Sequence, residues 1–83
     1  MYNILFDKKA LDFFKKLDKS IQERIGKKIQ ELAGNPRLGV PLIGNLAGLW
    51  KLRIGDYRVI YKIIEGNLVI LVLKIGHRKN VYD

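Results

Sequence analysis

The segment LWKLRIGDYRVIYKI, residues 49–63, reads as a strand, a tight turn and a second strand. Its turn is Gly55-Asp56, and a two-residue loop that begins with glycine favours a type II′ hairpin. This loop fixes the register and places Arg53 directly opposite Arg58. Like charges that face each other across strands are destabilising, so the pairing suggests an anionic ligand. Because side chains alternate between the two faces of a strand, the cations that share this face are Lys51, Arg53, Arg58 and Lys62.

The opposite face of the hairpin is apolar, and helices can cover it. The cationic face is then left toward solvent, so we expect Arg53 and Arg58 to be exposed neighbours across the two strands. The residues of the apolar face are Trp50, Leu52, Ile54, Tyr57, Val59 and Tyr61.

The first part of the chain predicts a strand and two helices. A short apolar strand over residues 2–6 leads to Asp7, which can cap the first helix. After a break at residues 18–20, Ser20 and Glu23 form a capping box that predicts the start of the second helix. Gly34 ends this helix. The apolar positions at helical spacing are Ala10, Phe13, Phe14 and Leu17, then Ile21, Ile25, Ile29 and Leu32.

The remaining segments complete the predicted fold class. Residues 34–48 hold four glycines and two prolines, a composition typical of a connecting loop. The segment Leu68–Ile75 is almost continuously apolar, as expected for a central strand buried on both faces. The order predicts an α+β fold with an N-terminal strand, a two-helix hairpin and a three-stranded antiparallel meander. Both helices are expected to pack on one sheet face.

Composition restricts the class of protein. The 83 residues predict a single domain over residues 1–83, and 48% hydrophobic residues are enough for a packed core. The chain has no cysteine, which excludes disulfides and thiolate chemistry and fits a cytoplasmic protein. Its net charge of +8 favours a polyanionic partner, such as nucleic acid, a ribosome or an acidic protein.

Three catalytic schemes lack the residues that they need. A metal site requires clustered His, Asp or Glu ligands, and the chain has one histidine and no acidic cluster. Ser20 is the only serine, which leaves little for a Ser-His-Asp triad. The glycines of residues 34–48 match neither a phosphate loop nor a dinucleotide fingerprint. The cationic face remains, and its grouped charges suit the extra negative charge of a phosphoryl transition state.

Two segments, GLWKLRIGDYRVIYKI and LVILVLKIGHRKNVY, together resemble the RelE toxins of bacterial and archaeal toxin–antitoxin modules. These toxins belong to the RelE/ParE superfamily, and the resemblance covers nearly the whole chain. It implies a type II toxin that cleaves mRNA in the ribosomal A site, with no metal or cofactor, and so inhibits translation. In that reaction the ribose 2′-hydroxyl attacks the adjacent phosphate. The resemblance also implies three partners, namely the ribosome, mRNA and a RelB-type antitoxin in a hetero-oligomer.

Residue types suggest how the resembling residues would act. Lys51 is the favoured general base, because neighbouring cations disfavour its charged form, and His77 is the rival base or an acid. Arg53 can bind charge but cannot be a base, since a guanidinium keeps its proton in proteins. Tyr82 would stack on a base or orient the 2′-hydroxyl. The implied catalytic set is Lys51, Arg53, Arg58, His77, Arg78 and Tyr82, with Lys62 and Lys79 as RNA contacts.

Two other functions fit the same sequence. A ParE-like protein would share the fold and inhibit gyrase without catalysis, although such relatives generally lack the full set of basic side chains. A catalytically inactive module would bind RNA or ribosomes through the same cations. Retention of the basic residues and of Tyr82 favours the nuclease over both alternatives.

Overall fold

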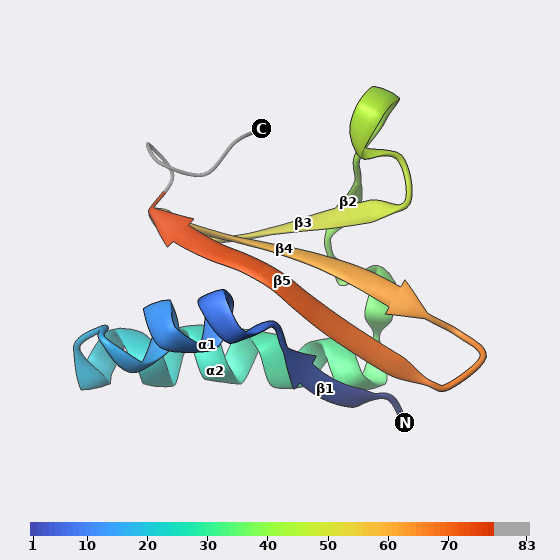
Figure 1. Cartoon of the computed structure of the whole chain (residues 1–83). Coiled ribbons are helices and arrows are strands. Elements are labelled where there is room, and N and C mark those ends of the chain that lie inside the picture. Colours follow the sequence, from blue (N-terminus) through green and yellow to red (C-terminus); the bar gives the residue numbers. More distant parts are fainter. Residues whose placement is uncertain (78–83) are drawn as a thin grey trace.

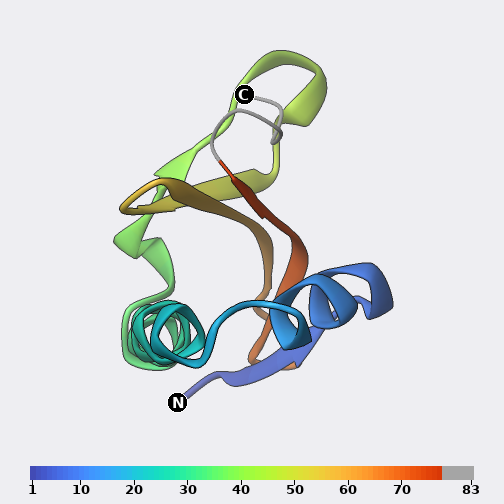
Figure 2. The same cartoon turned by 90° about the vertical axis from the view of Figure 1, so that its left-hand side faces the viewer.

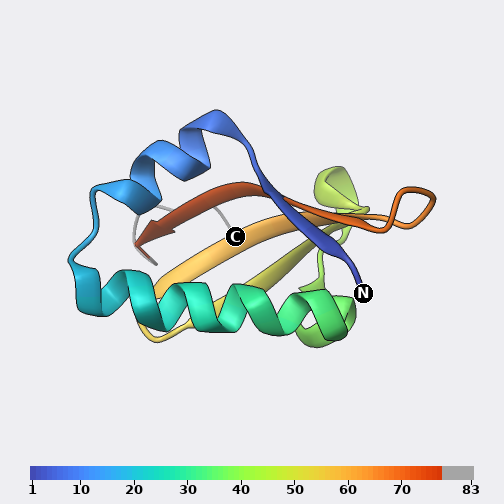
Figure 3. The ribbon, with the colours of Figure 1, turned by 90° about the horizontal axis from the view of Figure 1, so that it is seen from below.

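The structure is a computed structural model, and it describes residues 1–77. A five-stranded sheet carries both α-helices on one of its faces (Figure 1). The view from the helix side shows α1 and α2 in front of the strands (Figure 3). The predicted α+β class is therefore confirmed. The elements are β1 (Asn3–Phe6), α1 (Lys8–Lys15), α2 (Lys19–Gly34), η1 (Pro36–Leu38), β2 (Val40–Pro41), η2 (Gly44–Leu46), β3 (Leu49–Ile54), β4 (Tyr57–Ile64) and β5 (Val69–His77).

The strands lie in the order β1-β5-β4-β3-β2. β3, β4 and β5 form the predicted antiparallel meander, and the two-residue β2 pairs with the outer edge of β3. β1 pairs in parallel with β5, and β4 is consequently the middle strand. Figure 2 shows that the sheet is strongly twisted, as the right-handed twist of its strands requires.

The β3–β4 hairpin has the predicted register and turn. Arg53 pairs with Arg58 across the two strands. Gly55 has a φ of +59°, whereas Asp56 does not have a positive φ. This combination is typical of the backbone of a type II′ turn. Glycine suits this position for two reasons: a side chain would be strained there, and it would collide with the guanidinium of Arg24.

The start of α2 differs from the prediction. Asp18 precedes the helix and Ser20 lies inside its first turn, so the proposed capping box of Ser20 and Glu23 is wrong. The side-chain amide of Gln22 donates to two carbonyl oxygens at the end of α1, at 3.0 and 3.1 Å. This link joins the first turn of α2 to α1 and leaves only a short connection between them. Asp7 does cap α1 as predicted.

The core lies between the sheet and the two helices. The prediction that β5 is buried on both faces is wrong, because Leu71 and Leu73 are half-buried and Lys74 is exposed. β4 has a long neighbour on each side, whereas the four-residue β1 flanks only part of β5, and β5 is therefore less completely covered.

None of the helices within residues 1–77 is both long and apolar enough to cross a membrane. The largest fully buried side chains are Tyr61, Ile25, Ile29, Leu32, Ile70, Val59 and Val72.

Candidate functional site

A cleft of about 390 Å³ opens on the cationic face of the sheet. Lys51 and Arg53 of β3 and Arg58 of β4 line it together. Residues 38–40, which run from the end of η1 to the start of β2, form another part of the lining. We refer to residues 36–40 as the wall of the cleft. The cationic cluster predicted from the hairpin thus borders a hollow within the usual size range of small-ligand sites.

Arg58 is buried, so the expectation that it is exposed is wrong. Only 8% of its surface is accessible, whereas Arg53, its neighbour across the strands, is exposed as predicted. Arg58 lies on the middle strand and faces Gly76 on its other side. Arg53 lies on β3, and the short β2 pairs only with Lys51 and Trp50 of that strand. No strand therefore covers the outer edge of β3 at Arg53 within the described residues. A guanidinium held away from water interacts more strongly with an anion than an exposed one does.

Tyr61 ties the wall to the sheet. Its hydroxyl donates to the carbonyl oxygen of Pro36 at 2.8 Å and accepts from the backbone N–H of Gly39 at 3.0 Å. Burial raises the pKa of the Tyr61 hydroxyl, and the hydrogen bond from Gly39 acts in the opposite direction. Arg37 makes a second, exposed link through an ion pair with Glu65, with 2.9 Å between Nη2 and Oε2. The wall is therefore attached at two points, to Tyr61 on β4 and to Glu65 in the turn that follows β4.

Sequence reasoning missed this wall. It assigned Tyr61 to the core, which is correct, but a buried tyrosine in place of a phenylalanine also signals a hydrogen-bond partner for its hydroxyl. The composition around Gly39 predicts only a connecting loop. A Cβ at Gly39 would collide with the carbonyl oxygen of Lys51, so glycine is what allows the wall to approach β3 closely.

We expect Gly39→Ala to lower the free energy of unfolding by about 1–3 kcal/mol, because the added methyl group must push the wall away from β3. Urea denaturation measures the change. Gly66→Ala is the matched control, since Gly66 has open space around it and does not have a positive φ. The control should change the free energy of unfolding by less than about 0.5 kcal/mol. Equal effects of the two substitutions would contradict the close approach.

Tyr61→Phe should also lower the free energy of unfolding by about 1–3 kcal/mol, because it leaves two partly buried backbone groups of the wall without their partner. The measurement is again urea denaturation. Tyr57→Phe is the control. It removes the hydroxyl of a half-buried tyrosine on the same strand, and this hydroxyl makes neither of the two hydrogen bonds to the wall. If the two variants had the same free energy of unfolding, the hydrogen bonds of the Tyr61 hydroxyl would contribute nothing to stability.

His77 lies on the opposite face of the sheet from the cleft. It pairs with Tyr57, whose partner on β3, Ile54, is buried in the core. The rings of Tyr57 and His77 meet edge-on, with their centroids 5.5 Å apart. The residue of β5 beside Arg58 is instead Gly76. Since directly paired residues project to the same face, the register separates His77 from the three cations of the cleft.

A register shift in β5 explains the position of His77. Tyr61 pairs with Val72, but the preceding residue, Ile60, pairs with Lys74, so Leu73 is an extra residue in β5. Such a bulge reverses the alternation of side chains on the residues that follow it. Simple alternation from Val72 would have placed His77 on the cationic face.

The other predicted site residues fall into two groups. Lys62 is exposed on the same face as the cleft, opposite Leu49, but it does not line the cleft. Arg78, Lys79 and Tyr82 lie outside the described residues. Within residues 1–77, no three His, Asp or Glu side chains form a group that could hold a metal ion. The functional groups that the described cleft offers are one ammonium and two guanidinium groups.

Similarity to known proteins decides the family of this chain. Residues 4–82 match the sequence profile of a family described as the ParE toxin of the type II toxin–antitoxin system parDE. The chain belongs to this toxin family. The predicted place in the RelE/ParE superfamily is thereby confirmed.

The toxin is similar to RelE proteins in sequence and in structure. It is 30% identical over 80 residues to the mRNA interferase toxin RelE of Escherichia coli K12, a match covering 94% of this chain and 84% of that protein. It resembles a chain of the toxin–antitoxin complex RelBE2 of Mycobacterium tuberculosis with a TM-score of 0.85 and 30% identity, covering 93% and 98% of the two chains. For the intact Escherichia coli RelBE complex, the TM-score is 0.82 and the identity 26%, covering 93% and 96%.

Proposed function

We propose that this toxin is an endoribonuclease that cleaves mRNA in the ribosomal A site without a metal ion and so inhibits translation. The observation that carries the proposal is the cleft in which Lys51, Arg53 and Arg58 meet. When a ribose 2′-hydroxyl attacks the adjacent phosphate, the reaction needs a base and positive charge around the pentacoordinate phosphorus. The similarity to the mRNA interferase toxin RelE supports the same reaction.

Each of the three cations of the cleft has a role in this scheme. Arg53 and Arg58 hold the scissile phosphate, and the burial of Arg58 strengthens its interaction with the developing charge. Lys51 takes the proton of the 2′-hydroxyl, and the 2′-oxygen bonds to the phosphorus. The phosphorus–oxygen bond to the 5′-oxygen breaks, and that oxygen takes up a proton from water. The products are a 2′,3′-cyclic phosphate and a 5′-hydroxyl. Because His77 lies on the other sheet face, Lys51 is favoured as the base. Arg78 and Tyr82 remain candidates for assisting the leaving oxygen and for orienting the 2′-hydroxyl.

A ParE-like gyrase inhibitor is the second candidate, because the matching family is described as ParE toxin. Inhibition without catalysis needs neither a base nor a group that stabilises a transition state. A cleft that combines a lysine with two arginines, one of them buried, therefore favours the nuclease.

We also propose a RelB-type antitoxin as the protein partner, since the similar solved structures are RelBE complexes. The net charge of +8 favours an acidic segment, and the exposed part of the cationic face is the surface that such a segment would mask. Association should weaken as salt screens the exposed charges. A complex that left both the cleft and the C-terminal segment accessible would count against this masking.

Induction of the toxin in a bacterial host, with transcript ends and DNA breaks mapped together, tests the proposed function. Cuts in translated messages, in register with codons, are the expected result. The matched control is the same transcript without its start codon, which should stay intact if cleavage depends on translating ribosomes. Gyrase-linked DNA breaks with intact messages would contradict the nuclease and support the ParE-like activity.

A further inference from the structure

A second hollow, of about 280 Å³, lies between α2 and the end of the β3–β4 hairpin. We refer to it as the α2 groove. Arg53 lines both this groove and the cleft, so the two hollows adjoin at the edge of β3. The short β2 pairs only with Lys51 and Trp50 and leaves this part of the edge uncovered. The α2 groove is lined by Arg24, Lys27, Lys28, Glu31, Arg53, Ile54 and Gly55.

The two hollows together form one strongly positive surface. Six basic side chains and one carboxylate line them. The carboxylate, Glu31, lies 3.7 Å from Lys28 and compensates that residue. Within residues 1–77, no carboxylate lies at ion-pair distance from Arg24, Lys27 or Arg53. The guanidinium of Arg24 lies against Gly55, so one of these charges is at the turn of the hairpin.

We infer that the α2 groove binds the backbone of single-stranded RNA next to the phosphate held in the cleft. This inference rests on the proposed nuclease function and extends it to the nucleotides that flank the cut. One scissile phosphate needs only the three cations of the cleft, whereas a strand carries further phosphates at regular intervals. Arg53 stands where the strand passes from one hollow to the other. Grooves of Arg and Lys that follow a backbone bind single strands without sequence preference.

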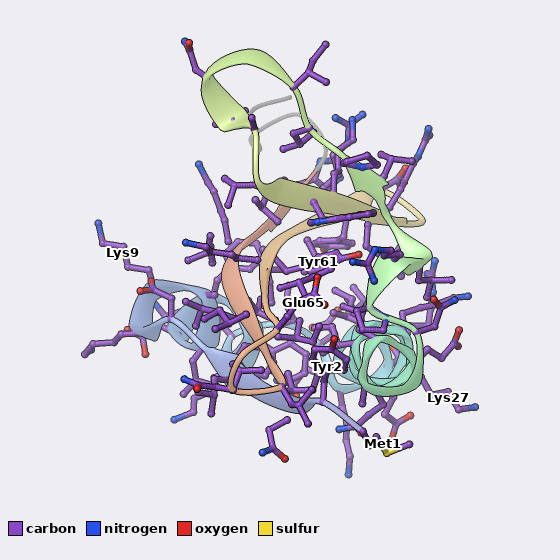
Figure 4. All side chains as sticks on the ribbon, turned by 90° about the vertical axis from the view of Figure 1, so that its right-hand side faces the viewer. Met1, Tyr2, Lys9, Lys27, Tyr61 and Glu65 are labelled. Carbon is purple, nitrogen blue, oxygen red and sulfur yellow. The ribbon has the colours of Figure 1, made fainter. Side chains whose placement is uncertain are left out.

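The test measures binding of a short fluorescent single-stranded RNA by anisotropy at several salt concentrations. Arg24→Gln combined with Lys27→Gln should raise Kd at about 0.1 M salt by roughly 10- to 30-fold. It should also reduce the slope of log K against log salt by about 1.4, the value for two lost phosphate contacts on a single strand. Lys8→Gln combined with Lys9→Gln removes the same charge from α1. Lys9 and Lys27 lie on opposite sides of the molecule (Figure 4), so this control should keep the wild-type Kd.

Because Arg24 packs against the hairpin turn, Lys27→Gln alone is measured as well, and thermal unfolding checks that each variant is folded. A Kd and a salt slope equal to those of the control would overturn the inference. So would weaker binding of the antitoxin with unchanged RNA binding, which would make the groove a protein-docking surface. Cleavage is scored separately on translated mRNA. Weakened RNA binding in the variant, together with a wild type that cuts no message, would contradict the proposed function and leave the groove as an RNA site.

Discussion

Arg58→Ala is expected to lower the rate constant of mRNA cleavage on programmed ribosomes by about 10²–10³-fold, the usual cost of losing one preorganised electrostatic stabiliser. The large effect follows from burial, since only 8% of the surface of Arg58 is exposed and its charge acts away from water. Single-turnover cleavage of a labelled message measures the rate constant. Circular dichroism and thermal unfolding show whether the variant keeps the fold.

Two further variants make the Arg58 experiment specific. Lys62→Ala is the matched control, because Lys62 lies on the same sheet face but outside the cleft. It should lower the rate by no more than a few-fold, as expected for an exposed charge. Arg58→Lys keeps the charge and loses the planar fork that holds two phosphate oxygens, so it should restore only part of the activity. Equal losses in Arg58→Ala and Lys62→Ala would contradict a special role for the buried arginine.

Lys51→Arg should abolish most cleavage while ribosome binding stays normal, because it keeps the positive charge and removes the titratable base. A general base contributes about 10²–10⁴-fold to a rate, and we expect a loss in that range. Cleavage and ribosome affinity are measured on the same preparation.

Arg53→Lys is the control for the Lys51 experiment. It also exchanges one cation for another in the cleft, but at a position to which we assign phosphate binding only. It should therefore lose much less cleavage activity than Lys51→Arg. Near-normal cleavage by Lys51→Arg would reduce Lys51 to a phosphate contact. The base would then have to come from outside the described cleft, because the sheet register separates His77 from it.

The sequence by itself determined the hairpin and its cationic face. A two-residue turn that begins with Gly55 fixes which residues face each other, so the pairing of Arg53 with Arg58 follows from local geometry. The same alternation of side chains separates the cations from the apolar face of the hairpin. Tyr61, on that apolar face, is fully buried. These features depend on residues close in the chain, so the local sequence is enough to specify them.

Only the tertiary structure decided how that face becomes a site. Arg58 is buried because β4 is the middle strand, and the order of the strands depends on where β1 and β5 pair. His77 lies on the other face because an extra residue at Leu73 reverses the alternation in β5. The wall stands against β3 because the Tyr61 hydroxyl binds a segment more than twenty residues earlier in the chain. Each of these features is a contact between distant parts of the chain, so propensity and periodicity, which are local, do not contain it.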